Sequence, residues 1–60
     1  MVRMKWAAWY VKVDGILLKQ QGVRAGNTDI PLRDYWDAGI RPEHVIEQAI
    51  QDNYLKPKED

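Results

Sequence analysis

The stretch from Lys5 to Gln21 constrains the fold of this chain more than any other segment, because an Asp-Gly pair lies at its centre. Aromatic and β-branched residues are frequent over residues 5–13, and residues 16–21 resume the apolar pattern. Asp14-Gly15 is a favoured pair for a type I′ turn, the turn that joins two antiparallel strands with matching twist. The sequence therefore predicts an N-terminal β-hairpin.

The register of this hairpin predicts two different faces. A two-residue loop pairs Val13 with Ile16 and creates an aliphatic face that we expect to lie against the rest of the protein. That face consists of Trp9, Val11, Val13, Ile16 and Leu18. The opposite face mixes rings with ammonium groups and is the candidate partner-binding surface, with rings that stack on bases or on a peptide. Its candidate residues are Trp6, Tyr10, Lys12, Lys19 and Gln21.

A structural alternative exists for the same rings. Trp6 can pack under the N-terminus or across a dimer interface, and Lys19 can lie over Tyr10 as an ordinary cross-strand cation–π contact. The exposure of Trp6 and Tyr10 distinguishes these two interpretations.

Two helices are expected after the hairpin. Two glycines and an Asn predict a connecting loop over residues 22–28, with a short third strand around 23–25 as the alternative. The first helix is expected near 30–38 with Gly39 as its stop, and the second near 42–54. Their core-facing residues are Leu32, Tyr35, Trp36, Val45, Ile46, Ala49 and Ile50.

These elements predict one α+β domain of order ββαα over residues 1–55, followed by a disordered polar tail at residues 56–60. The chain has 60 residues and no cysteine, so neither a disulfide nor a thiolate metal site stabilises its thin core. We therefore expect self-association. No apolar run approaches the ~20 residues of a membrane span, and the expected location is cytoplasmic.

Charge is divided unevenly along the chain. Residues 1–33 hold six basic and two acidic side chains, whereas residues 34–60 hold three basic and seven acidic ones, so that +4 and −4 cancel. The basic half can face a nucleic acid, or one half can dock on the other half or on a second copy. Nucleic-acid modules usually carry a net basic excess, which this chain lacks, so a protein partner is expected first.

The segment 39–50, GIRPEHVIEQAI, resembles the turn and second helix of ribbon-helix-helix DNA-binding repressors and covers about a fifth of the chain. The resemblance implies a dimer whose β-ribbon enters the major groove, with Lys19 and Gln21 contacting bases and Arg41 binding a phosphate. A helix-turn-helix over residues 32–53 is a second DNA-binding alternative.

Candidate catalytic groups are few. His44 is the single histidine, and we expect it to be a surface imidazole. Four carboxylates could hold a divalent cation if the helices crossed suitably: Asp34, Asp37, Glu43 and Glu47. A small metal-dependent enzyme is thus a third interpretation, but acidic residues are common on solvated helix faces, and we expect no catalytic site, cofactor or metal.

The sequence thus favours a small non-catalytic accessory protein that docks on a larger protein and self-associates as a homodimer. The alternative is a small dimeric DNA-binding transcriptional regulator that uses the basic residues of the hairpin half.

Overall fold

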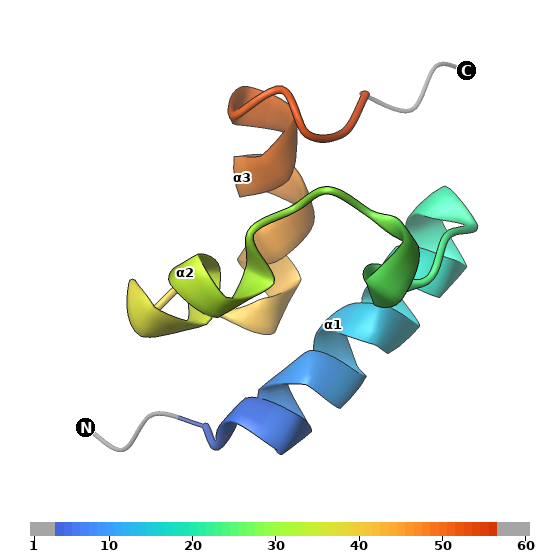
Figure 1. Ribbon diagram of the computed structural model, residues 1–60. Helices are drawn as coiled ribbons and strands as arrows, with labels where there is room; N and C mark the ends of the chain where they lie inside the picture. The colour runs from blue at the N-terminus through green and yellow to red at the C-terminus, as the bar shows by residue number, and fades with distance from the viewer. Residues whose placement is uncertain (1–3, 57–60) are drawn as a thin grey trace.

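The computed structural model describes residues 4–56, and every regular element in that part is helical (Figure 1). In chain order the elements are α1 (Trp6–Gln21), the 3-10 helix η1 (Ala25–Asn27), α2 (Leu32–Asp37), the 3-10 helix η2 (Pro42–His44) and α3 (Val45–Gln51). No β-strand occurs between residues 4 and 56. The predicted α+β fold is therefore wrong, and the protein is a small bundle of helices.

The predicted hairpin is replaced by the single helix α1. Its largest buried side chains, Trp9, Val13 and Leu17, recur every four residues, so the segment also carries the helical period. A helix satisfies its backbone hydrogen bonds internally, whereas a lone two-stranded ribbon is marginal in water. Gly15 costs about 1 kcal/mol relative to Ala inside a helix, less than the burial of three large apolar side chains gains.

Left-handed glycines end α1 and α2. Gly22 follows α1 at φ 71°, and Gly39 follows α2 at φ 80°. After α2 the N–H of Gly39 bonds to the carbonyl of Trp36 at 3.0 Å, and the N–H of Ile40 bonds to that of Tyr35 at 3.1 Å. These are the two bonds of a Schellman motif, which requires a left-handed residue after the helix. The prediction that Gly39 stops the helix before it is confirmed.

The two C-terminal helices lie near their predicted positions but are shorter. α2 falls within the predicted range 30–38, while η2 and α3 together end at Gln51 rather than at residue 54. Asn53 takes a left-handed conformation at φ 66° just beyond α3. The loop after α1 holds η1 instead of a third strand. Apart from the exposed Lys56, the predicted tail lies outside the described residues.

α1 forms one side of the core, and the remaining elements form the other. Of the residues expected on the aliphatic hairpin face, Trp9 and Val13 are buried and Ile16 is half-buried, but Val11 and Leu18 are exposed. The helical residues predicted to face the core all pack in or against it. Within residues 4–56 the buried hydrophobic core consists of Trp9, Val13, Leu17, Ala25, Ile30, Leu32, Tyr35, Val45, Ile46 and Ala49, and Pro42 is buried as well.

Two indole N–H groups tie distant segments together. Trp9 Nε1 donates to the carbonyl of Ile40 at 2.8 Å, which joins α1 to the turn after α2. Trp36 Nε1 donates to the carbonyl of Met4 at 2.8 Å, which joins α2 to the residues before α1. A buried Trp needs such a partner for its polar atom, so each ring contributes both area and a fixed orientation.

Candidate functional site

The face of α1 turned away from the core is the candidate functional site. In Figure 1 the other helices all lie on one side of α1, and the opposite side of that helix is uncovered. Val11 is 69% exposed and Leu18 is 46% exposed, although both are aliphatic. They are seven residues apart, about two helical turns, and so lie one above the other. An aliphatic pair aligned in this way on an exposed helix is more informative than a single exposed leucine.

A shallow groove runs along this face. It is lined by Val11, Lys12, Gly15, Ile16 and Lys19, and its walls are mainly apolar. Gly15 is one of the lining residues and faces open space, because a Cβ atom built there meets no side chain or other segment within 4 Å. Ala8, one turn before Lys12 and seven residues before Gly15, is exposed as well. Two small residues two turns apart allow another backbone to approach this helix closely.

Three lysines mark one edge of the same face. Lys5, Lys12 and Lys19 are exposed and repeat every seven residues, so they form a row along the helix. Within residues 4–56 none of the three forms an ion pair. We call the exposed set Ala8, Val11, Gly15 and Leu18, together with these lysines, the outer face of α1.

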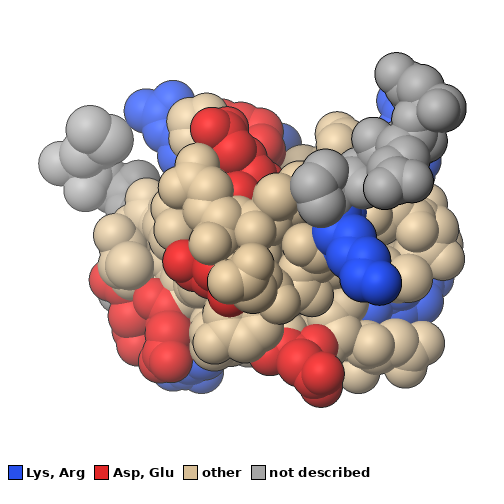
Figure 2. All heavy atoms as spheres, turned by 90° about the horizontal axis from the view of Figure 1, so that it is seen from above, with Lys and Arg blue, Asp and Glu red and all other residues tan. Residues whose placement is uncertain are grey.

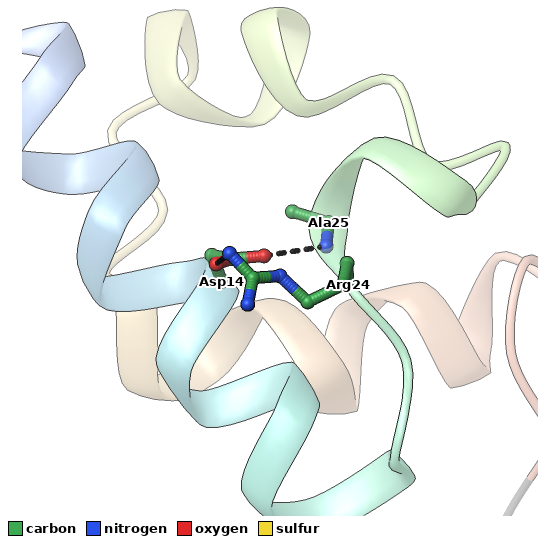
Figure 3. A network of polar contacts seen from close by, with 3 residues as sticks. All are labelled: Asp14, Arg24 and Ala25. Atoms are coloured by element: carbon green, nitrogen blue, oxygen red, sulfur yellow. Dashed lines mark hydrogen bonds and ion pairs between the residues drawn. The ribbon is translucent and has the colours of Figure 1, made fainter.

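The acidic residue of α1 serves an internal contact instead. Figure 3 shows Asp14 directed toward the start of η1, where its Oδ1 accepts the Ala25 N–H at 2.8 Å and its Oδ2 pairs with Arg24 at 2.8 Å. Asp14 therefore anchors the loop after α1 instead of forming the hairpin turn that the Asp-Gly pair predicts. The charged side chains of the outer face are then all lysines.

Two of the predicted partner-binding residues, Trp6 and Tyr10, are half-buried on the inner side of α1. The Trp6 ring lies 5.5 Å from that of Tyr10 and 5.7 Å from those of Trp9 and Trp36, measured between centroids. The Arg33 guanidinium lies 5.1 Å from the Trp6 ring and 5.0 Å from the Trp36 ring, a cation–π position over both. The rings thus pack on one another rather than forming an open stacking platform.

The other predicted site residues are dispersed. Lys12 and Lys19 lie together on the outer face, whereas Gln21 is half-buried at the last turn of α1. Because Trp6–Gln21 is a helix, the predicted ribbon in which Lys19 and Gln21 contact bases does not exist. Arg41, the predicted phosphate contact, is exposed just before η2.

Acidic side chains are spread over the surface. Figure 2 shows red spheres at the top, the left, the middle and the lower edge of the view, with blue ones at the upper left, the lower left and the right. The four carboxylates predicted as a cation site, and His44, are all exposed; they are Asp34, Asp37, Glu43 and Glu47. No three acidic, His or Cys side chains of residues 4–56 converge as a set that could hold a metal ion.

One side-chain hydrogen bond joins α2 to the residue that follows α3. The Tyr35 hydroxyl donates to an Asp52 carboxylate oxygen at 2.6 Å. Burial of the ring, together with the hydrogen bond and the negative charge of Asp52, raises the pKa of the Tyr35 hydroxyl well above its usual value near 10. The contact therefore depends on a protonated phenol and an ionised carboxylate.

The outer face of α1 was missed because the hairpin register assigned Val11 and Leu18 to the core. The signal that finds it is the second apolar series Val11, Gly15 and Leu18, at spacings of four and three residues, beside the main buried series of the same helix. A helix that carries two such series has one more apolar face than a single core covers.

Comparisons with protein-family models, with curated proteins and with solved structures found no match to this chain. Within the described residues no helix has the length and apolar character needed to cross a membrane. The fold and the outer face of α1 thus carry the functional argument.

Proposed function

We propose that this protein is a small, non-catalytic docking protein of the cytoplasm that binds a larger protein through the outer face of α1. The observation that carries the proposal is the exposure of Val11 and Leu18, at 69% and 46%, on a helix whose opposite side packs Trp9, Val13 and Leu17 into the core. Apolar side chains aligned on one exposed helix face, with charge at the edge, are typical of a surface that a partner covers.

DNA binding is less well supported by the same surfaces. α3, which a helix-turn-helix would place in the major groove, exposes Glu47 and follows the exposed Glu43. Both carboxylates would face phosphates, and phosphate contacts are the main source of affinity in such complexes. The row of lysines on α1 is bordered by aliphatic side chains, which suit a protein better than a phosphate backbone.

The test uses the purified protein to capture partners from the cells that express it, followed by reconstitution with each captured protein in purified form. We expect Leu18→Glu to weaken the reconstituted complex at least about tenfold, because a carboxylate replaces an aliphatic contact at the interface. Gln51→Glu is the matched control, since it adds the same charge at an exposed position on α3. If Leu18→Glu and Gln51→Glu bind equally well, the proposal is wrong.

Self-association stays a prediction from the sequence, and the outer face of α1 is the surface on which it can be tested. Sedimentation of wild type and Leu18→Glu over a range of concentrations tests it. A dimer that the substitution disrupts supports self-association, and a monomer at all concentrations contradicts it.

A further inference from the structure

Resting on the proposed docking role, we infer that the outer face of α1 binds an acidic amphipathic helix of the partner protein. The shape of the face, its apolar series and its single sign of charge indicate the chemistry of that partner.

The dimensions of the face favour one helix as the occupant. α1 has 16 residues and is therefore about 24 Å long and about 10 Å wide, so its uncovered side offers only a few hundred Å². Standard interfaces between globular surfaces bury about 800 Å² on each partner. A single helix lying along the groove matches the smaller area, and it meets the groove with side chains at spacings of three and four residues.

Gly15 favours close approach of that helix. Gly15 is exposed in the wall of the groove, and no side chain or other segment lies within 4 Å of a Cβ built there. A large side chain of the partner, such as Leu, can rest on Gly15 between Val11 and Leu18 in the manner of a knob in a hole.

The positive charge of the outer face favours a partner helix that carries negative charge. Lys5, Lys12 and Lys19 line one edge without ion pairs in residues 4–56, and the carboxylate of Asp14 is held by Arg24 and Ala25. Carboxylates on the flank of a partner helix would meet a complementary row, which steers association and fixes register.

The same charges disfavour a second copy of this chain on this face. An antiparallel, two-fold symmetric pair of outer faces places both lysine rows along the same edge, where like charges repel. In a parallel pair, the lysine row of each copy lies against the opposite edge of α1 in the other copy. That edge holds Asp14, whose two carboxylate oxygens are already bonded within its own chain. A foreign acidic helix meets neither difficulty.

The experiment uses three labelled 18-residue peptides and fluorescence anisotropy. One peptide carries Leu along one helical face and Glu on the flanks, the second has Lys in place of Glu, and the third has the composition of the first in a scrambled order. We expect the first to bind wild type at least about tenfold more tightly than the other two, and more weakly at high salt because screening shortens the range of the charges.

A charge swap gives the sharpest result. The double variant Lys12→Glu, Lys19→Glu should lose the acidic peptide and prefer the Lys peptide, whereas Lys56→Glu, an exposed lysine outside the face, should bind as wild type does. Equal binding of the acidic and Lys peptides, equal binding of the scrambled peptide, or no binding at all would overturn the inference.

The outcomes also separate this inference from the proposed function. If the Lys peptide binds as well as the acidic one, but Leu18→Glu weakens both peptides and the reconstituted partner, the docking role stands and the acidic helix is wrong. If Leu18→Glu weakens neither peptide nor partner, both ideas fail. A dimer that buries Leu18 in sedimentation would replace the acidic helix with a second copy.

Discussion

The inner and the outer face of α1 differ less in composition than in what covers them. The inner face holds Trp9, Val13 and Leu17, all at most 1% exposed, while the outer face holds Val11 and Leu18, which are largely in contact with water. These apolar residues follow the helical period on both faces, although three lysines also lie on the outer one. The comparison shows that an apolar series predicts a buried surface but does not say whether the same chain or another one buries it.

The adjacent leucines of α1 give the largest expected contrast. Leu17→Ala removes a side chain with no exposed surface and should lower the free energy of unfolding by about 2–5 kcal/mol, because it deletes core contacts and leaves a cavity. Leu18→Ala should change it by less than about 0.5 kcal/mol. Urea unfolding of both variants followed by tryptophan fluorescence gives the two values, and similar losses for both would mean that Leu18 is also buried.

Tyr35 tests the elements that cover the inner face. Tyr35→Phe removes the hydrogen bond to Asp52 and should lower the free energy of unfolding by about 1–2 kcal/mol, because the acceptor is ionised. Since the pKa of Tyr35 is raised in the folded protein, its contribution is complete below about pH 10, the unfolded pKa, and is lost as the pH rises above that value.

The pH dependence supplies the control for this prediction. Wild type should lose stability more steeply above about pH 10 than Tyr35→Phe, because the unfolded chain releases the phenolic proton while the folded protein retains it. Thermal unfolding of both proteins from pH 8 to 11 measures the difference. Parallel curves would contradict the raised pKa.

Asp14 lies between the two faces and anchors the loop after α1. Asp14→Ala removes the acceptor of the Ala25 N–H and should destabilise the protein by about 1–2 kcal/mol. Asp14→Asn retains an acceptor oxygen and loses only the ion pair with Arg24, which is largely exposed, so about 0.5 kcal/mol is expected. Equal losses for Asp14→Asn and Asp14→Ala in chemical unfolding would show that the charge, and not the acceptor, matters.

Gly15→Ala is the one substitution in this series that is expected to stabilise the protein. It should raise the free energy of unfolding by about 0.5–1 kcal/mol, because Ala favours the helix and its Cβ meets no side chain or other segment within 4 Å. The same methyl group stands in the groove of the outer face, so it should weaken a docked helix. Calorimetry and peptide binding on one sample test both parts, and a stabilised variant with unchanged binding would remove Gly15 from the contact.

The sequence predicted the C-terminal half of the fold better than the N-terminal half. Gly39 and Pro42 are strong local signals for the end of one helix and the start of the next, and both helices lie near their expected positions. Residues 5–21 have no such signal. Their apolar residues fit a period of two as well as one of 3.6, and the Asp-Gly pair favoured the hairpin.

The wrongly predicted hairpin also gave the wrong neighbours to the residues of the predicted partner-binding surface. Lys12 and Lys19 line one groove with Val11, whereas the predicted hairpin placed them beside Trp6 and Tyr10. The exposure of Val11 is a tertiary property. It depends on the elements that cover the other side of α1, and no local pattern around Val11 reports where those elements lie.

Thiol labelling at residues 17 and 18 decides between a helix with two faces and the hairpin. The chain has no cysteine, so Leu17→Cys and Leu18→Cys each carry one thiol. If α1 is a helix, the thiol at residue 18 should react nearly as fast as a thiol in the unfolded chain. The thiol at residue 17 should react at least about 100-fold more slowly, because it becomes accessible only when the protein transiently unfolds around it. The hairpin buries residue 18 and exposes residue 17, so the reversed order at low protein concentration would contradict the helix and its outer face.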